Sequence, residues 1–347
     1  MDFPHRRYNP LKEEWVIVAA HRCKRPWAGQ TEPSAEQVPP RFDATNPLCP
    51  GVQRSSGLTT PNYKSTYAFT NDFPAFLPET PSLKSDDDPL FRAQSISGTC
   101  RVMCFHPHSN LQLATMEHSA IETVIDGWIG QMKELAPTYI WVQIFENKGA
   151  MVGCSNPHPH CQIWAGDFMP NEPATKDRAQ KQYFMKNGRP LLVDYVNQEL
   201  KRKERLVVET ERFVVVVPYW AVWPYETILL PKRHIPRITD LNEMDKRDLA
   251  KTMKELLTRY DNLFKCTFPY SMAWHGAPTG SFLSTDCADY WQLHAVYLPP
   301  LLRSSTIKKF MAGYELVCEP QRDLTPEMAA KTLRDLSTVH FRNQNAQ

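Results

Sequence analysis

The sequence predicts an α+β fold built from two similar halves, each with a mostly antiparallel sheet flanked by helices. Three observations support this prediction. Many of the 30 prolines separate short apolar runs, a pattern that favours extended segments and turns over a helical bundle. Long amphipathic stretches lie between groups of these runs. The same order of elements recurs after roughly 150 residues, which indicates a duplicated unit.

Three stretches have helical periodicity. Residues 116–136 and 242–264 repeat apolar side chains at i, i+3, i+4 and i+7, so each presents one apolar face. The third stretch, residues 324–337, begins with Thr325 as a helix N-cap and Pro326 as the first helical residue. We therefore expect one long helix in each half and a third helix near the end of the second half.

Eight stretches rich in β-branched and aromatic residues are expected to form strands. They are residues 14–20, 100–105, 139–147, 160–165, 212–219, 226–232, 270–275 and 290–298. In each half, strands precede the long helix, and a further strand, a loop and a histidine-bearing strand follow it. The predicted domains are residues 1–187, which carry a His-Pro-His motif, and residues 188–347, in which this motif is lost.

Composition limits the classes of partner. The chain has 42% hydrophobic and 22% charged residues, enough for a large core. Its 40 basic and 38 acidic side chains give a formal net charge of +2, without the basic excess of nucleic-acid or membrane-surface binding proteins. The sequence has no apolar run of membrane-spanning length, and its first residues lack the apolar core of a secretory signal. We expect neither nucleic acid nor a membrane as a partner.

The nine cysteines indicate a cellular compartment. They form no C-x-x-C pair and are scattered through apolar stretches. Buried free thiols of this kind are typical of a reducing compartment. We therefore expect a cytoplasmic protein.

The stretch GCSNPHPHCQIWAG, residues 153–166, places His158 and His160 on either side of Pro159. Side chains alternate along a strand, so the two histidines are expected to share one face. Proline fixes its own φ, restricts the preceding residue and removes one amide donor, which predicts an edge or interrupted strand. The carbonyl of His158 could then fix the tautomer of His160 and leave the other ring nitrogen free to attack phosphorus.

Neighbouring polar residues could bind a phosphate. Gln162 lies on the same face as His160, and its amide can donate to a phosphoryl oxygen as negative charge builds. Gly153 and Ser155 offer a turn with further donors, and Asn147 adds a polar group at a strand end. From the residues alone, three interpretations of the two histidines stay open: a nucleophile, zinc ligands on a strand, or polar residues at a sheet edge.

The sequence as a whole resembles the galactose-1-phosphate uridylyltransferases, a family within the histidine-triad superfamily. The resemblance extends almost from end to end, with long motifs in the family's order. Among them are HRRYNPL, FTNDFPA, WVQIFENKGA, GCSNPHPHCQIWA, VPYWAVWPYETILLPKRH, FPYSMAWHGAP and KKFMAGYE. The resemblance implies two histidine-triad-like units. Hydrolases of the superfamily have a further histidine where this chain has Gln162, and in the uridylyltransferases that glutamine accompanies transfer.

The resemblance also implies a reversible reaction in galactose metabolism. UDP-glucose and galactose 1-phosphate would give UDP-galactose and glucose 1-phosphate. The exchange would proceed by double displacement through a covalent uridylyl-histidine on His160. Ser155, His158 and Gln162 would complete the catalytic site.

The family's motifs imply which residues bind the UDP-sugar and the hexose phosphate. The uridine would contact Ser55, Asn71 and Asp72. The phosphates would lie among Asn147, Gly153, Cys154, Ser155 and Gln162. The hexose phosphate would contact residues from the neighbouring subunit, namely Lys309, Phe310, Tyr314, Glu315 and Gln321. The resemblance therefore implies a homodimer with shared active sites.

Two arginines match family positions at that shared interface. They are Arg22 and Arg25, whose guanidinium groups suit phosphate. From the sequence alone, a solvated basic turn is the simpler interpretation of both arginines.

The first metal site of the family is altered in this chain. Bacterial relatives bind zinc through two cysteines, a loop histidine and the first histidine of His-Pro-His. Here Asn46 replaces the first cysteine and Ser109 replaces the loop histidine, which leaves Cys49 and His158. Two ligands are too few for a closed zinc site. A zinc ion is expected here only with His108 as a further ligand.

The second family metal site uses one glutamate and three histidines. His275 and His294 are kept, but Lys176 stands at the glutamate position and Val296 at the third histidine position. A protonated lysine and a valine offer no metal ligand. We therefore expect this second site to hold no metal. No organic cofactor is expected.

Other functions compete with uridylyl transfer. A related nucleotide-sugar phosphorylase or hydrolase of the superfamily would use phosphate or water as the acceptor. Gln162 disfavours a hydrolase, because an amide cannot protonate a leaving group. A nucleotide-sugar-binding scaffold without catalysis is disfavoured by the presence of His160.

Overall fold

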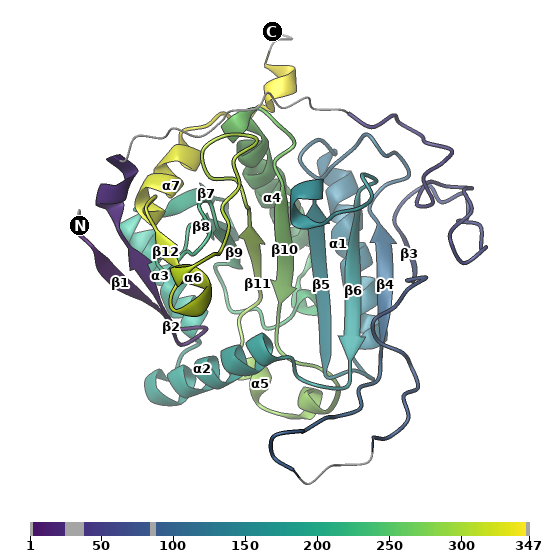
Figure 1. The fold of residues 1–347 in the computed structure, drawn as a ribbon, viewed down its shortest axis with the longest axis horizontal. Coiled ribbons are helices and arrows are strands. Elements are labelled where there is room, and N and C mark those ends of the chain that lie inside the picture. The colour runs from purple at the N-terminus through teal and green to yellow at the C-terminus, as the bar shows by residue number, and fades with distance from the viewer. Residues whose placement is uncertain (1–2, 25–37, 84–87, 345–347) are drawn as a thin grey trace.

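The computed structural model describes residues 3–24, 38–83 and 88–344. Its central feature is a nine-stranded antiparallel sheet (Figure 1). Four neighbouring strands come from the first half: β3 (Tyr67–Thr70), β4 (Gly98–Cys104), β6 (His160–Gly166) and β5 (Trp141–Lys148). The next five come from the second half: β10 (Tyr270–His275), β11 (His294–Leu298), β9 (Thr227–Pro231), β8 (Phe213–Val216) and β7 (Leu206–Glu209).

The two parts of this sheet repeat one another. In the first half, α1 (His118–Leu135) connects β4 to β5, and β6 follows. In the second half, α4 (Glu243–Phe264) follows β9 and precedes β10, and β11 comes next. The central pair β5–β10 joins the halves in antiparallel register. The predicted α+β class is confirmed, and His160 and His294 begin corresponding strands.

The two long helices cover one face of the sheet, as Figure 1 shows. The apolar stripe of α1 packs into the same buried core as α4 and the central strands. Asn242 caps α4: its side chain accepts from the Asp245 amide, and the Asp245 carboxylate accepts from the Asn242 amide. Along β5, buried residues on the helix side alternate with half-buried Gln143, Phe145 and Asn147 on the other face. This second face, called the open face below, carries the polar groups.

A smaller sheet joins the two ends of the chain. It has the order β1 (His5–Asn9), β2 (Glu14–Val18) and β12 (Gln321–Arg322). The remaining helices are α2 (Asn171–Asn187), α3 (Leu191–Arg202), α5 (Cys287–Tyr290), α6 (Tyr314–Val317) and α7 (Pro326–Arg334). Helix α7 has the predicted cap, because the Thr325 hydroxyl accepts from the Met328 amide. Within the described ranges, no helix combines the length and apolarity needed to cross a membrane.

The structure departs from the predicted elements in three ways. All eight predicted strands are present, but β1, β3, β7 and β12 are additional. Helices α2 and α3 were not predicted, since α2 is mostly polar and α3 is short, although prolines at their N-caps mark both starts. Strand β6 begins only at His160, so Pro159 interrupts the chain before a central strand rather than marking an edge.

Candidate active site

His160 lies half-buried at the start of β6. Its Nδ1–H donates to the carbonyl oxygen of His158 at 2.7 Å, the hydrogen bond expected from the sequence. Because Nδ1 carries the proton, Nε2 keeps its lone pair. Burial lowers the pKa of His160, and the hydrogen bond to His158 only partly offsets this. The ring is therefore neutral at neutral pH, as a nucleophile requires.

His158 is only 1% exposed, and both of its ring nitrogens are hydrogen-bonded. The Tyr63 hydroxyl donates to the Leu48 carbonyl at 2.7 Å, so it accepts the Nε2–H of His158 at 2.8 Å. The Nδ1 atom then accepts from the Ser109 hydroxyl at 2.8 Å. Burial lowers the pKa of His158 to about 4. His158 is thus a neutral, fixed support whose carbonyl orients His160.

The side chains around His158 do not fit a zinc ion. The Cys49 sulfur lies 3.7 Å from His158 Nδ1, but the Ser109 hydroxyl contacts both, at 3.1 Å from the sulfur and 2.8 Å from the nitrogen. Asn46, at the position of the missing cysteine, instead exchanges amide hydrogen bonds with Asn156 at 2.8 and 2.9 Å. Hydrogen bonds therefore take the place that a metal would need.

His108 does not complete a zinc site either. Its Nε2 accepts from the Arg41 guanidinium at 3.1 Å. Within the described ranges, no three His, Cys, Asp or Glu side chains are grouped so that they could hold a metal ion. The tentative zinc site of Cys49, His108 and His158 therefore lacks support in the geometry.

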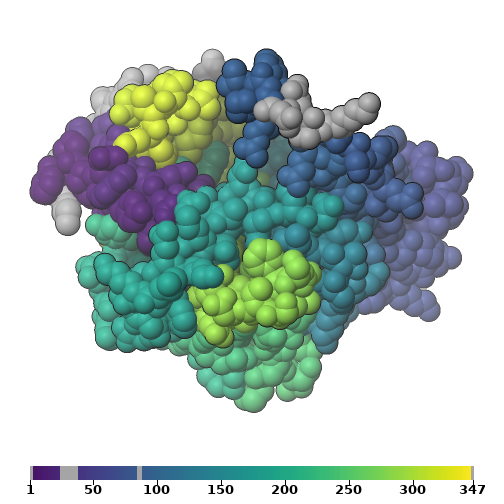
Figure 2. Space-filling model, turned by 90° about the horizontal axis from the view of Figure 1, so that it is seen from below, coloured from purple at the N-terminus to yellow at the C-terminus, as the bar shows by residue number. Residues whose placement is uncertain are grey.

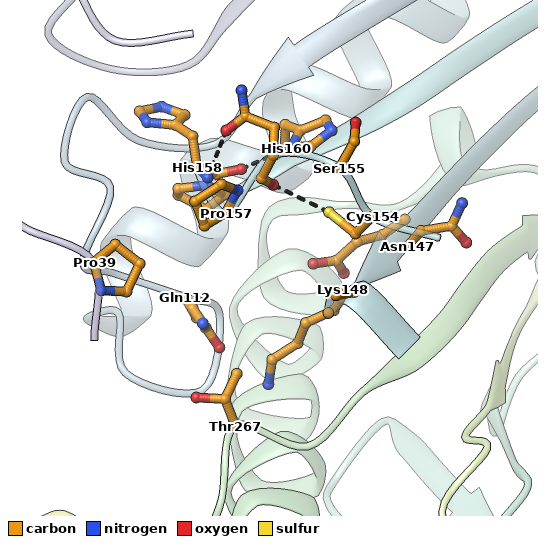
Figure 3. A pocket seen from close by; sticks show the side chains of 15 residues that line it. Pro39, Gln112, Asn147, Lys148, Cys154, Ser155, Pro157, His158, His160 and Thr267 are labelled. Atoms are coloured by element: carbon orange, nitrogen blue, oxygen red, sulfur yellow. Dashed lines mark hydrogen bonds between the residues drawn. The ribbon is translucent and has the colours of Figure 1, made fainter. Parts of the chain in front are cut away.

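A cavity of about 310 Å³ lies beside His160, where β5 ends and β6 begins (Figure 3). Among the residues that line it are Asn147, Cys154, Ser155, His158 and His160, all of them predicted site residues. Gly149 and Gly153 turn the chain between the two strands with φ of +92° and +84°, values that favour glycine. Gly153 itself is exposed and does not line the cavity. The turn brings Cys154 and Ser155 close to His160.

Two amide side chains on the open face are held by their oxygen atoms; Asn147 lines the cavity, whereas Gln162 is not among its lining residues. Gln162 Oε1 accepts from the Trp164 indole N–H at 3.1 Å. Asn147 Oδ1 accepts from the Ser271 hydroxyl at 2.8 Å. With both oxygens occupied, the NH₂ groups are the ends that can donate to a ligand. Both residues stand on the open face, as the strand alternation predicts.

Two charged residues that the sequence analysis did not single out also line the cavity. Glu146 is buried and accepts from the Tyr270 hydroxyl at 3.0 Å, and burial raises its pKa to about 7. Lys148 Nζ donates to Asp261 at 2.9 Å. In the sequence, both could have been noticed because they flank Asn147 at the end of a mostly apolar strand.

The predicted uridine residues lie beyond the end of β3. Asp72 forms an ion pair with Arg54 at 3.3 Å, and the Arg54 guanidinium lies 4.0 Å above the Phe69 ring. Asn71 Oδ1 accepts from the backbone amide two residues ahead at 2.9 Å. Ser55 is exposed beside Arg54. Arg54 was missed by the sequence analysis, and its proximity to Ser55 was the available signal.

Four residues predicted to act across a dimer interface form one cluster near β12. Lys309 Nζ contacts both carboxylate oxygens of Glu315, at 2.6 and 2.8 Å. Glu315 also accepts from the backbone N–H of Gln321 at 2.9 Å. Gln321 Oε1 in turn accepts from Arg22 at 2.6 Å. None of these four residues lines the cavity beside His160.

Two other predicted interface residues are exposed aromatic side chains. Phe310 is 72% exposed and Tyr314 is 59% exposed, which is unusual for aromatic side chains. Arg25 lies outside the described residues. Within one chain, the structure therefore brings together the residues around His160 and, separately, the residues around Glu315.

The predicted second metal site is a buried cluster at the other end of the sheet. His275 and His294 are opposite each other in the β10–β11 pair, with ring centroids 5.2 Å apart. Lys176 Nζ lies 3.5 Å from His275 Nε2 and 2.9 Å from a Glu172 oxygen. Burial, followed by the charge of Lys176, lowers the pKa of His275 well below its usual range and that of His294 to about 3. A lysine ammonium and Val296 give a poor fit to a metal ion.

Solved structures share this fold. A uridylyltransferase structure superposes with a TM-score of 0.75 at 23% identity, covering 95% of this chain and 97% of that one. An ADP-glucose phosphorylase from Arabidopsis thaliana superposes with a TM-score of 0.74 at 22% identity, covering 96% of this chain and 99% of that one. At this level of identity the likeness establishes the fold.

Sequence relatives identify the family. The models of the N-terminal and C-terminal domains of galactose-1-phosphate uridyl transferase match residues 1–170 and 176–345. The galactose-1-phosphate uridylyltransferase of Rattus norvegicus is 55% identical over 337 residues, covering 97% of this chain and 89% of the relative. That of Haemophilus influenzae is 52% identical over 343 residues, covering 99% and 97%. This chain belongs to the galactose-1-phosphate uridylyltransferase family.

Proposed function

We propose that this chain exchanges a uridylyl group between hexose 1-phosphates: UDP-glucose and galactose 1-phosphate give UDP-galactose and glucose 1-phosphate. The proposal rests on one observation: the tautomer of His160 and its position at the cavity. Its Nδ1–H is bound to the His158 carbonyl at 2.7 Å, and the ring lines the cavity. A neutral imidazole in this tautomer presents an Nε2 lone pair to a phosphorus atom. The family shared with the relatives above supports the choice of substrates.

In the first step, His160 Nε2 attacks the α-phosphorus of UDP-glucose. A P–N bond forms, the bond from phosphorus to the bridging oxygen breaks, and glucose 1-phosphate leaves. Its leaving oxygen belongs to a phosphate, which departs as an anion without a proton. This explains why a site with Gln162 in place of a further histidine suffices for transfer, whereas a poorer leaving group would need a general acid.

In the second step, galactose 1-phosphate occupies the place that glucose 1-phosphate has left. A phosphate oxygen attacks the same phosphorus, the P–N bond breaks, and His160 is released as a neutral ring. One site thus binds both hexose phosphates in turn, and each displacement is in line. Because the imidazole keeps its Nδ1–H on the His158 carbonyl throughout, the positive charge of the uridylylated ring stays stabilised.

The two fixed amides would stabilise charge at phosphorus. Gln162 and Asn147 stand on the same face of the sheet as His160, and their NH₂ groups are the free ends because Trp164 and Ser271 hold their oxygens. Negative charge grows on the phosphoryl oxygens in the transition state, and such preorganised donors lower the barrier without reorganising. Ser155 and Cys154, next to the nucleophile, complete the phosphate surroundings.

We also propose that a second copy of this chain completes the site. Lys309, Glu315 and Gln321 form one hydrogen-bonded cluster that does not line the cavity of the same chain. Phe310 and Tyr314 beside them are exposed aromatic side chains, which are typical of an interface. A homodimer would cover these rings and bring the cluster to the hexose phosphate of the partner. A cytoplasmic location stays a prediction from the cysteines.

A labelling experiment tests the proposed chemistry. The protein is incubated with UDP-glucose labelled in the uridylyl phosphorus, without hexose 1-phosphate, and the bound label is mapped by mass spectrometry. We expect about one acid-labile label per chain on His160, released as UDP-galactose when galactose 1-phosphate is added. The matched control is His294→Gln, which should label normally. Label on another residue, or label retained by His160→Ala, would refute the proposal.

A further inference from the structure

A cluster of four polar residues joins helix α2 to the second half of the sheet; three of them are buried, and the Glu172 side chain is 47% exposed. It consists of Lys176, Glu172, His275 and His294 and is called the Lys176 cluster below. Lys176 is 2% exposed, which is rare for a lysine. It comes from α2, whereas the two histidines come from β10 and β11. The side chains therefore meet from three separate elements.

The two histidines offer lone pairs rather than protons to the interior of the cluster. His294 donates its Nδ1–H to the Gln292 carbonyl at 2.8 Å, so its Nε2 is a lone pair, and this atom has no partner among the described residues. His275 Nε2 lies 3.5 Å from Lys176 Nζ and accepts from the ammonium, which leaves the ring proton on Nδ1, an atom without a hydrogen-bond partner among the described residues. Two neutral imidazoles arranged in this way are the usual donors to a cation.

The cation of the cluster is the Lys176 ammonium: burial lowers the pKa of this lysine, and the charge and hydrogen bond of the Glu172 carboxylate oppose that shift. Lys176 Nζ lies 2.9 Å from Glu172, one helical turn earlier in α2. Burial opposes the charge of Glu172, but Lys176 and Lys12 outweigh it and lower the pKa of this carboxyl to about 2. The ammonium thus contacts one carboxylate and one imidazole, and the second imidazole, His294, is stacked on His275 with a ring-centroid distance of 5.2 Å. Carboxylate and imidazole are groups that zinc also accepts, but the described Glu172, His275 and His294 are not grouped so that they could hold a metal ion by themselves.

Helix α2 holds Lys176 in this position. The Asp177 carboxylate, one residue along the helix, accepts from the Tyr290 hydroxyl at 3.0 Å and from the Trp291 indole at 2.7 Å. Figure 2 shows α2 in teal beside the yellow-green segment around α5, which agrees with these contacts. The helix is therefore anchored at the residue next to the lysine, which fixes the backbone position from which Lys176 enters the cluster.

We propose that the Lys176 ammonium, paired with Glu172, is a tethered cation that replaces a metal ion beside His275 and His294. The cluster keeps its geometry without metal, because the charge is part of the chain. The tethered cation lies where α2 meets β10 and β11 and does not depend on the reaction at His160.

Rebuilding a metal site tests the proposal. Val296 lines the same cavity as Glu172 and His275, so a histidine at this position reaches the cluster. We expect the double variant K176E V296H to bind about one Zn²⁺ per chain and to show the visible absorption of tetrahedral Co²⁺ when Co²⁺ is supplied instead. Wild type should hold less than about 0.1 equivalent after dialysis against a chelator, with an unchanged melting temperature. Lys181→Glu, at an exposed position of α2, is the matched control and should behave as wild type.

A smaller change covers the case in which the double variant does not fold. Lys176→Glu alone replaces the cation by a carboxylate beside His275 and His294, which gives three ligands. Zinc at about 100 times its Kd should raise the melting temperature of this variant by roughly 3–8 °C, with no shift in Lys181→Glu. The proposal is overturned if Lys176→Glu shows no zinc-dependent shift. It is also overturned if the folded double variant takes up no metal, or if wild type carries about one metal ion per chain that disappears in His275→Gln.

Discussion

The two halves of the central sheet hold a histidine at the same place, but only one half is arranged for catalysis. His160 and His294 each begin a strand, and each donates its Nδ1–H to the carbonyl two residues earlier, at 2.7 and 2.8 Å. The tautomer is therefore a property of the repeated fold. His160 lines a cavity, whereas His294 is fully buried. Access to the Nε2 atom separates a nucleophile from a structural residue.

The residues near each histidine in the sequence also distinguish the two halves. Gln162, two residues after His160, brings an amide donor, whereas Val296 at the equivalent place brings none. The residues two positions before are both locked: His158 by Tyr63 and Ser109, and Gln292 by hydrogen bonds to backbone groups. Both halves keep a hydrogen-bonded residue two positions before the histidine, whereas of these two positions after the histidine, 162 and 296, the first alone carries an amide donor. This comparison indicates which substitutions should affect chemistry and which should affect stability.

The largest effect is expected from removing the nucleophile. His160→Ala should lower kcat/KM for the exchange by about 10⁴-fold or more, since this ring is the group proposed to carry the uridylyl intermediate. His294→Gln should change kcat/KM by less than about tenfold, because this ring does not face the substrate. Steady-state assays of both variants, with circular dichroism to confirm folding, measure the contrast. Equal losses in the two variants would mean that the halves are not functionally distinct.

Converting the first half toward the second should give the next largest effect. Gln162→Val places the side chain of position 296 beside the nucleophile and removes a donor to the phosphoryl oxygens. We expect kcat to fall by about 10²–10³-fold with KM for UDP-glucose changed by less than about threefold, the pattern of a donor that acts in the transition state. The reverse change, Val296→Gln, should leave kcat near the wild-type value. A rise in KM that accounts for the whole loss would show that Gln162 only binds the substrate.

Much of this comparison could be predicted from the sequence. The order of strands and helices, the position of His160 and its hydrogen bond to the His158 carbonyl follow from periodicity and from the restriction that Pro159 imposes. What could not be predicted depends on contacts between distant segments. The hydroxyl of Tyr63 reaches His158 across 95 residues of chain, and Lys148 meets Asp261 across 113. Neither pair leaves a local pattern in the sequence.

The zinc expectation is left without geometric support for a related physical reason. The sequence shows which ligands are missing but not what replaces them. Ser109 and Tyr63 supply hydroxyls that satisfy both nitrogens of His158, and Asn46 pairs with Asn156. A hydroxyl or amide can substitute for a metal only when its direction is right, and direction depends on the fold.

A smaller effect is expected on stability below neutral pH. The pKa values of His158 and His294 are lowered to about 4 and about 3 by burial, whereas both titrate near 6.5 in the unfolded chain. Between these values the unfolded state binds more protons than the native state, so the free energy of unfolding falls as pH falls. From pH 6.5 to pH 5 the loss should approach about 2 kcal/mol for each residue.

Urea unfolding at pH 7 and pH 5 measures this loss. His294→Gln, which cannot titrate, should be less sensitive to pH than wild type by about the same 2 kcal/mol. The exposed His118, at the start of α1, provides the control, and His118→Gln should keep the wild-type dependence. If His294→Gln also kept it, the ring would not be buried as a neutral group.

The smallest effect should come from the hydroxyl that supports His158. Tyr63→Phe removes the acceptor of the His158 Nε2–H and leaves a buried donor without its partner, which should cost about 1–2 kcal/mol of unfolding free energy. Tyr67→Phe is the control, since its ring stacks on Tyr63 at 5.3 Å without contacting His158 by a hydrogen bond in the described structure. Activity of Tyr63→Phe should fall by less than about fivefold, because the carbonyl that orients His160 belongs to the backbone and stays in place. A much larger loss of activity at unchanged stability would mean that the His158 ring acts in the chemistry, and the two halves would then differ in their support as well as in their donors.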